Sequence, residues 1–338
     1  MKPLAFTGKV IETSPIDGAD FIHSVTVVCG EGGKWRGVAR KDINVGDTVV
    51  VFLQDAVLPP DDPRFEFMKS SGYRVKMRRF KGAPSECLVM PNDSGVNTIG
   101  TDVTELYRVT KYEKVLPAGM SGDIVAPFPT HLCPMTDEVN YQTVPELVAM
   151  MDSDPFYVTQ KVDGTSCTAW VDYDGKLHVC SRRYELKEFD AHGKTNVYWE
   201  VARKYDLGRL PPNLFFQFEI AGPGIQKNPL GLKEREMFLF SVYDGNNSRY
   251  LPFVEDCDLC RKYSVPIITV DFLAKKYSLP MVKVCEVSNT GLGYIPSTES
   301  LTKMAEIKYP NGRDGEGIVI RALDSEWSFK VINLLYKD

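Results

Sequence analysis

The sequence lacks the features that would place the protein in a membrane or draw the whole molecule onto a polyanion. Its longest aliphatic run, Val49-Val50-Val51-Phe52-Leu53, is far shorter than the roughly 20 apolar residues of a membrane-spanning helix. The formal net charge is -5, so any nucleic-acid site must be a local cluster of cations. No apolar signal segment follows Met1-Lys2-Pro3, and we therefore expect a soluble, intracellular protein.

Cysteine and histidine are too scattered to predict a disulfide framework or a metal centre. We interpret the eight cysteines as reduced residues of an intracellular protein, most of them buried. Only Cys257 and Cys260 have the spacing of metal ligands, and no second pair follows at zinc spacing. We interpret these two as structural residues of a helix. The four histidines form no cluster and are interpreted as ordinary loop or strand residues: His23, His131, His178 and His192.

The first hundred residues contain short strands separated by turns and no long helical pattern. We expect strands at 8–11, 22–29 and 35–39, a turn and a buried strand at 45–53, and an alternating strand at 71–80. This pattern predicts a small β-barrel over residues 1–100. Residues 73–82 hold five basic residues and no acid, which fits either a solvated strand face or a strip for nucleic acid. Alternation places three of these cations on one face: Arg74, Lys76 and Arg78.

A stretch rich in proline, glycine and threonine follows, and we assign residues 101–142 to a connector. Thr143 and Glu146 form a predicted capping box at the start of a helix, and strands and helices then mix over residues 143–338. We expect further helices at 194–205, 255–263, 271–277 and 298–308, the last capped by Ser297. We expect strands at 158–161, 166–172, 177–181, 214–220, 238–243, 318–322 and 327–332. The chain is therefore predicted to be α+β.

The octapeptide at 159–166, TQKVDGTS, places a lysine and an aspartate beside a glycine. Alternation along a strand puts Lys161 and Asp163 on the same side, and Gly164 permits a sharp turn. A lysine beside a carboxylate is usually a plain ion pair. It becomes a nucleophile where desolvation, neighbouring cations or a metal lower the pKa of its amine. The octapeptide alone leaves both interpretations open.

Further cations and carboxylates stand in later predicted strands or at their ends, often beside aromatic residues. Cations neutralise phosphates, carboxylates hold a hydrated Mg²⁺ or Mn²⁺ and ribose hydroxyls, and an aromatic ring stacks on a base. Such a combination is typical of a site for a nucleotide and its metal. The candidates are Lys161, Asp163, Arg182, Glu219, Glu316 and Lys330.

In their order along the chain, these segments resemble the motifs of the covalent nucleotidyltransferase superfamily of polynucleotide ligases and capping enzymes. The matching segments are Lys161–Ser166, Ser181–Arg183, Gln217–Ala221, Phe238–Tyr243, Glu316–Arg321 and Ser328–Asn333. Within the superfamily, residues 14–22, 45–59, 74–91 and 222–229 resemble the nick-sealing RNA ligases of the fifth RNA ligase family, which carry an N-terminal OB domain.

Two details of the resemblance concern the end of the chain. The sequence stops eight residues after Lys330, so we expect none of the C-terminal OB domain that DNA ligases and capping enzymes carry. In the last motif, Ser328 stands where the superfamily often has a first lysine. Arg321 and Lys227 are the candidates to assist Lys330 in neutralising a phosphate.

The resemblance implies an OB-fold barrel followed by an adenylyltransferase domain built on antiparallel sheets with flanking helices. It implies that Lys161 attacks the α-phosphate of ATP to form lysyl-AMP, that AMP then moves to a 5′-phosphate, and that a 3′-OH finally displaces AMP. The implied substrate is a nicked duplex with RNA on the 3′-OH side. We expect a monomer, and the implied duplex favours the nucleic-acid interpretation of residues 73–82.

The resemblance also implies roles for single residues. Asp163, Glu219 and Glu316 would hold a metal through water, or the ribose. Phe240, in preference to Phe238, would stack on adenine. The implied catalytic residues are Lys161, Asp163, Glu219, Glu316 and Lys330. The implied nucleotide-binding residues are Gln160, Lys161, Gly164, Arg182 (or Arg183), Glu219, Phe240, Glu316 and Lys330.

Three alternatives stay open. A DNA ligase of the same superfamily would seal an all-DNA nick equally well. A non-catalytic RNA-binding relative would form no covalent adduct with ATP. A tRNA-binding structural module, which the N-terminal domain alone suggests, would leave Lys161 and Glu316 unexplained.

Overall fold

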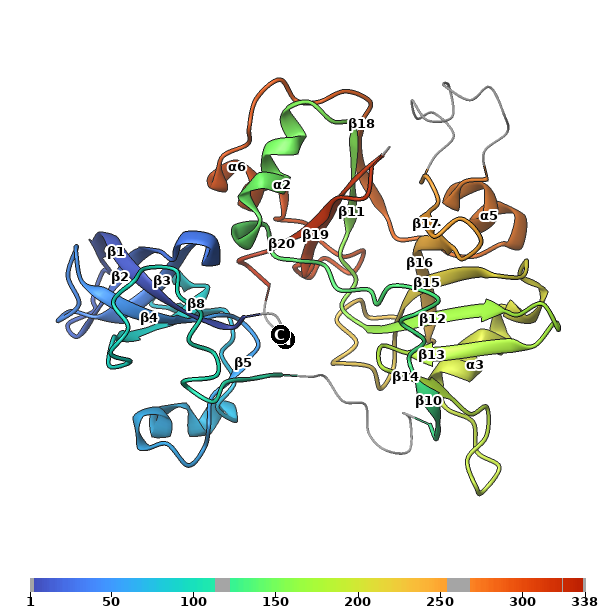
Figure 1. Cartoon of the computed structure of the whole chain (residues 1–338), viewed down its shortest axis with the longest axis horizontal. Helices are drawn as coiled ribbons and strands as arrows, with labels where there is room; N and C mark the ends of the chain where they lie inside the picture. The colour runs from blue at the N-terminus through green and yellow to red at the C-terminus, as the bar shows by residue number, and fades with distance from the viewer. Residues whose placement is uncertain (1–2, 113–121, 254–267, 324, 337–338) are drawn as a thin grey trace. The chain divides into compact units, whose positions relative to one another are not determined.

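The computed structural model describes residues 3–112, 122–253, 268–323 and 325–336. The chain divides into two compact units, the first from residues 1–114 and 141–145, the second from residues 115–140 and 146–338 (Figure 1). Each unit has its own hydrophobic core. The helix predicted at 255–263, together with Cys257 and Cys260, lies outside the described residues.

A closed five-stranded barrel in the order β1-β2-β3-β8-β4 forms the centre of the first unit. Its strands are β1 (Ala5–Pro15), β2 (Ile22–Val28), β3 (Lys34–Arg40), β4 (Thr48–Phe52) and β8 (Cys87–Pro91). All neighbours are antiparallel except β3 and β8. Gly8 is required inside the barrel, because a Cβ there would lie 2.5 Å from Val27 Cγ1. The predicted OB-type barrel is confirmed.

The connection from β4 to β8 differs from the prediction. It contains β5 (Ala56–Val57), the 3-10 helix η2 (Pro63–Ser71), β6 (Arg78–Phe80) and β7 (Ala83–Ser85), and β5 pairs with β9 (Thr110–Lys111). The single alternating strand predicted at 71–80 is therefore wrong. Gly72 and Tyr73 both have left-handed backbone angles, with φ of 62° and 60°, so the chain turns after η2 and a strand begins only at Arg78.

Two antiparallel sheets form the second unit (Figure 1). The larger has seven strands in the order β10-β14-β13-β12-β15-β16-β17, and the smaller has four in the order β18-β11-β19-β20. The larger sheet contains β10 (Ile124–Pro127), β12 (Thr165–Val171), β13 (Leu177–Ser181), β14 (Tyr184–Leu186), β15 (Leu214–Ala221), β16 (Glu236–Asp244) and β17 (Arg249–Tyr250). The smaller contains β11 (Phe156–Gln160), β18 (Val284–Ser288), β19 (Gly317–Ala322) and β20 (Ser328–Ile332).

Short helices accompany these sheets. They are α2 (Pro145–Ala149), α3 (Val197–Lys204), α5 (Val270–Tyr277) and α6 (Thr298–Met304), with 3-10 turns η4 (Met150–Asp152) and η5 (Leu207–Arg209). The 3-10 turns η1 (Gly30–Gly32) and η3 (Tyr141–Thr143) belong to the first unit. Asn196 caps α3 by accepting from two backbone N–H groups. Ser297 caps α6 as predicted. The helix predicted to start at Thr143 is shorter, because Thr143 ends η3. The α+β class is confirmed.

Candidate active site

The pairing of β11 with β19 brings Lys161 and Glu316 together. These strands are antiparallel neighbours, and Gln160 at the end of β11 lies opposite Ile318 near the start of β19. Lys161 therefore leaves β11 at the edge where Glu316 enters β19. The Nζ of Lys161 lies 2.7 Å from Oε2 of Glu316, and both side chains are mostly buried. Residues 155 positions apart in the chain thus form one ion pair.

Three carboxylates set the charge state of this lysine. Burial lowers the pKa of the Lys161 amine, but the carboxylates of Glu316, Glu219 and Asp163 raise it, and the net shift is upward. The resting side chain is therefore an ammonium, not a free amine. A ligand that draws Glu316 away from Lys161 would remove the nearest of these charges and ease the loss of the proton.

A buried tyrosine holds the backbone on both sides of this ion pair. The hydroxyl of Tyr309 donates to the carbonyl of Lys161 at 3.0 Å and accepts from the backbone N–H groups of Asp163 and Glu316, each at 3.2 Å. Tyr309 is only 2% exposed. One side chain therefore fixes the end of β11 relative to the start of β19. Sequence reasoning missed Tyr309, because a single tyrosine in a loop carries no local signal.

Gly164 and Asp163 lie where the chain after Lys161 passes the larger sheet. A Cβ at Gly164 would lie 2.2 Å from the carbonyl oxygen of Ile220, so the glycine permits close approach to β15. The Gly164 carbonyl accepts from Nε2 of Gln226 at 3.1 Å. Asp163 is 2% exposed and its carboxylate accepts from the hydroxyl of Tyr336. The segment after the lysine is thus held from several sides.

Strand register arranges further candidates along one face of the smaller sheet. Thr159 lies opposite Val319, which lies opposite Lys330. Two pairs further along, Tyr157 lies opposite Arg321, which lies opposite Ser328. Alternate residues of a strand share a face, so Lys161, Lys330 and Arg321 all belong to the face that carries Tyr157. About 13 Å of strand separates Tyr157 from Lys161.

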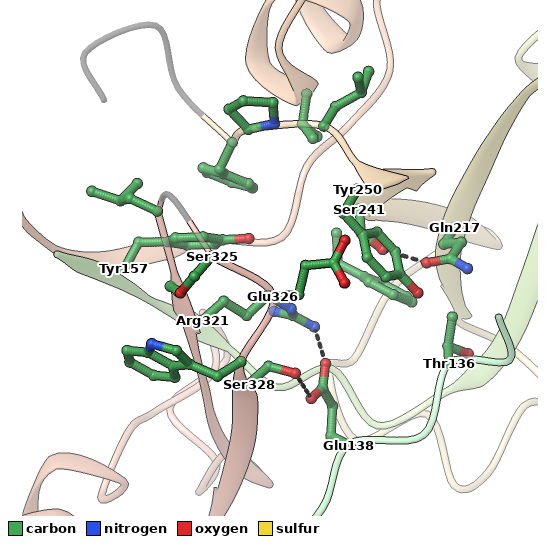
Figure 2. Close-up of a pocket in the computed structure, with 18 of the residues that line it drawn as sticks. Thr136, Glu138, Tyr157, Gln217, Ser241, Tyr250, Arg321, Ser325, Glu326 and Ser328 are labelled. Atoms are coloured by element: carbon green, nitrogen blue, oxygen red, sulfur yellow. Dashed lines mark hydrogen bonds and ion pairs between the residues drawn. The ribbon is translucent and has the colours of Figure 1, made fainter. Parts of the chain in front are cut away.

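A pocket of about 330 Å³ opens at the Tyr157 end of this face, between the two sheets (Figure 2). Glu138 reaches into it and accepts from Arg321 Nη2 at 2.8 Å and from Ser328 Oγ at 2.6 Å. The Arg321 guanidinium lies 5.5 Å from the centre of the Phe240 ring. Burial raises the pKa of Tyr157 to about 12. The pocket thus combines the ion pair of Arg321 and Glu138 with aromatic walls.

Comparison with known proteins identifies the family. A model of the RNA ligase family matches residues 154–333, and an OB-fold domain model matches residues 4–92. The chain belongs to the RNA ligase family. No curated protein matches it.

Among solved structures, this ligase family member is similar to the RNA ligase of Naegleria gruberi. The apo form of a variant of that ligase is 28% identical, with a TM-score of 0.77, and the match covers 98% of this chain and 96% of that one. The same ligase with pyrophosphate is 29% identical, with a TM-score of 0.77 and coverage of 98% and 97%. A variant with ATP and manganese is 29% identical, with a TM-score of 0.75 and coverage of 98% and 96%.

The remaining candidate residues divide into those near the ion pair and those elsewhere. Glu219 on β15 lies opposite Ser166 and Phe238. Phe238 and Phe240 both pack on the cluster that contains Tyr309. Gln160 is 6% exposed, and its side chain donates to the carbonyl of Lys308 at 3.2 Å.

The two arginines after β13 are exposed. Arg182 forms an ion pair with Asp137. Lys227 is exposed in the loop after β15. Arg321, a candidate partner for Lys330, is instead paired with Glu138. Glu138 itself was missed, because it comes from a segment without secondary structure far from every motif.

The structure corrects one part of the predicted cationic strip. Arg74 is 7% exposed, pairs with Asp55 at 2.7 Å and lies over the Tyr112 ring at 3.7 Å. A buried, paired arginine does not face solvent, so the predicted common face of Arg74, Lys76 and Arg78 does not form. Lys76 is half-buried, whereas Arg78 is exposed.

Within the described part of the chain, no group of three or more His, Cys, Asp or Glu side chains is close enough to hold a metal ion by itself. Mg²⁺ usually keeps several waters and takes one or two carboxylates plus substrate phosphates. The carboxylates around Lys161 suit such a partial ligand set. None of the helices described is long and apolar enough to cross a membrane.

Proposed function

We propose that this member of the RNA ligase family uses ATP to seal 3′-OH/5′-phosphate nicks in duplex nucleic acid with RNA on the 3′-OH side. One observation carries the proposal: a mostly buried lysine at a strand end, 2.7 Å from Glu316 and under the influence of two further carboxylates. The Naegleria ligase with ATP and manganese, and with pyrophosphate, supports the choice of nucleotide.

The first step transfers AMP to the lysine. After losing a proton, the Nζ of Lys161 attacks the α-phosphorus of ATP, a P–N bond forms, and the P–O bond to pyrophosphate breaks. Such in-line transfer depends mainly on positioning and charge neutralisation. Tyr309 supplies positioning by fixing the backbone of Lys161 and Glu316. Lys330, on the same face of the sheet, would neutralise the α-phosphate.

The two later steps reuse the same groups. The 5′-phosphate of the nucleic acid attacks the α-phosphorus of lysyl-AMP and releases the lysine. The 3′-OH then attacks the activated 5′-phosphorus and AMP leaves. A divalent cation bound with waters by Asp163, Glu219 and Glu316 would neutralise phosphate charge in these steps.

Adenine would lie in the pocket at the Tyr157 end of the cleft. Phe240 lines this pocket beneath the Arg321 guanidinium, which fixes the orientation of the ring for stacking. Arg182, whose partner Asp137 lines the pocket, would contact ribose or phosphate once it leaves Asp137. The exposed cations of the barrel would contact the backbone of the duplex.

The test is covalent labelling. The full chain is incubated with [α-³²P]ATP and manganese and run on a denaturing gel. We expect a labelled band that is absent in Lys161→Ala and present in Lys303→Ala, whose ammonium pairs with Glu306 on the surface. A labelled band in Lys161→Ala would refute the nucleophile, and no band in the unaltered chain would leave a non-catalytic RNA-binding relative.

A second measurement separates RNA from DNA ligase activity. The unaltered chain is given two nicked duplexes that differ only in the 3′-OH strand, which is RNA in one and DNA in the other. We expect sealing of the RNA-containing nick to be faster. Equal rates would identify a DNA ligase of the same superfamily.

A further inference from the structure

Two connections of the barrel that the nucleotide chemistry does not use lie together. The first is the loop from Ile16 to Phe21 between β1 and β2. The second is the β6–β7 hairpin, residues 78–85, within the connection from β4 to β8. Given the strand order β1-β2-β3-β8-β4, these are the two connections with which OB barrels commonly bind oligonucleotides. We call them together the loop–hairpin surface.

Direct contacts join the two parts of this surface. Ala83 of the hairpin packs on a cluster that contains Ile16 and Ala19 of the loop. A Cβ built on Gly18 would lie 3.5 Å from the Nζ of Lys81 at the hairpin tip. The base of the hairpin is tied to the barrel, because Ser85 Oγ accepts from the backbone N–H of Val38 at 2.9 Å. The loop and hairpin therefore form one continuous surface.

This surface exposes aromatic rings. Phe21 is 83% exposed, the highest fraction among the large hydrophobic residues described, and Phe80 on the hairpin is 38% exposed. An isolated exposed hydrophobic residue needs no explanation. Phe21, however, has a fixed backbone, since its carbonyl accepts from the N–H of Lys41 at 3.1 Å. A ring presented on a held backbone loses little entropy when a flat ligand stacks on it.

The charge beside these rings is positive. Arg78, Arg79 and Lys81 are exposed on the hairpin, and no acid occurs between residues 67 and 85. The loop contributes the exposed acids Asp17 and Asp20, so the three hairpin cations outnumber them. In a chain of net charge -5, this local excess favours an anionic partner.

We propose that the loop–hairpin surface binds an unpaired RNA nucleotide, whose base stacks on Phe21 while the hairpin cations hold the neighbouring phosphates. Bases inside a duplex are stacked on each other and cannot offer a face to Phe21, whereas unpaired bases can. Aromatic rings beside a cationic groove are the usual means of binding single strands. The proposal rests on the proposed function only in taking RNA as the ligand.

The test measures binding without catalysis. Fluorescence anisotropy is recorded on the full chain, without ATP, using a 5′-fluorescein single-stranded RNA that has no 5′-phosphate. We expect Phe21→Ala to weaken binding at least about fivefold and Phe21→Trp to restore it. Phe67→Ala is the matched control, because Phe67 is 59% exposed in the same unit but lies beside the acidic Glu66. The affinity of this variant for the RNA should stay unchanged.

A second variant tests the cations. Each phosphate contact on a single strand contributes about 0.7 to the steepness with which log affinity falls against log salt. Because Arg78→Gln/Lys81→Gln removes two such contacts, we expect this slope to become shallower by about 1.4. Unchanged affinity in Phe21→Ala, or an equal loss on a fully paired duplex of the same length, would overturn the proposal. Lysyl-AMP formation, measured on Phe21→Ala and Phe21→Trp, should be unaltered, so a failure here is distinct from a failure of the proposed function.

Discussion

The hydroxyl of Tyr309 offers the sharpest test of how the site is held together. Tyr309→Phe removes one oxygen and keeps the ring in its buried position. Three hydrogen bonds are lost, to the carbonyl of Lys161 and from the N–H groups of Asp163 and Glu316. At about 1 kcal/mol each, the free energy of unfolding should fall by about 3 kcal/mol. For a unit of this size, the melting temperature should fall by roughly 6–12 °C.

The same change should slow chemistry at saturating ATP. Without Tyr309, the end of β11 is no longer tied to the start of β19, and a displacement of about 1 Å in a reacting group costs on the order of 100-fold in rate. The assays are a thermal melt and single-turnover formation of lysyl-AMP. Tyr294→Phe is the control, since Tyr294 is 57% exposed. If Tyr309→Phe melts and reacts like the unaltered chain, the tyrosine does not organise the site.

Three further changes test other parts of the site. In Glu316→Gln, the pKa of the Lys161 amine should fall because its nearest carboxylate is lost. The rate of lysyl-AMP formation rises with pH as that amine loses its proton, so this rise should move to lower pH. The maximal rate should drop. Glu138→Ala leaves Arg321, whose side chain is 13% exposed, without its carboxylate, and should cost about 3 kcal/mol of stability in a denaturant titration. Gly164→Ala places a Cβ 2.2 Å from a backbone oxygen of β15 and should cost about 1–3 kcal/mol and abolish labelling by ATP.

Matched variants separate these effects from those of removing any ion pair or replacing any glycine. Glu306→Ala breaks an ion pair in which the Lys303 side chain is 80% exposed and should change stability by less than about 1 kcal/mol. Gly208→Ala has nothing within 4 Å of the added Cβ and should be tolerated. A loss in these controls equal to that in Glu138→Ala or Gly164→Ala would contradict the reasoning, as would a pH profile of Glu316→Gln that moves upward.

The barrel could be predicted where local pattern decides the structure. The run from Val49 to Phe52 is wholly buried in β4, as an apolar run between turn signals predicts. The stretch at 71–80 misled, because alternation describes a strand only if the backbone stays extended. Tyr73 has a positive φ, and Asp55, nearly twenty residues earlier, draws Arg74 inward. A distant partner of this kind leaves no trace in the local pattern.

In the site, too, some residues could be predicted from local pattern and others could not. Lys161 and Glu316 could be singled out because each belongs to a short string with a chemical reason. Their ion pair follows from the register of β11 with β19, which the sequence does not specify locally. Tyr309 and Glu138 act entirely through contacts made across the fold, so neither stands out by composition, periodicity or spacing.

The distribution of charge along the cleft bears on the proposed orientation of the nucleotide. At the pocket end, Arg321 and Glu138 neutralise each other, and Ser328 donates to the same carboxylate. Two arginines and three carboxylates line this end together with aromatic rings, so positive and negative charges nearly balance there. An uncharged base suits it. Lys330 lies midway along the face, level with Thr159. The other end holds Lys161 against three carboxylates, Asp163, Glu219 and Glu316. A triphosphate would be repelled there unless divalent cations came with it. The charges along this face therefore support the proposed use of a metal and the proposed placement of the base away from Lys161.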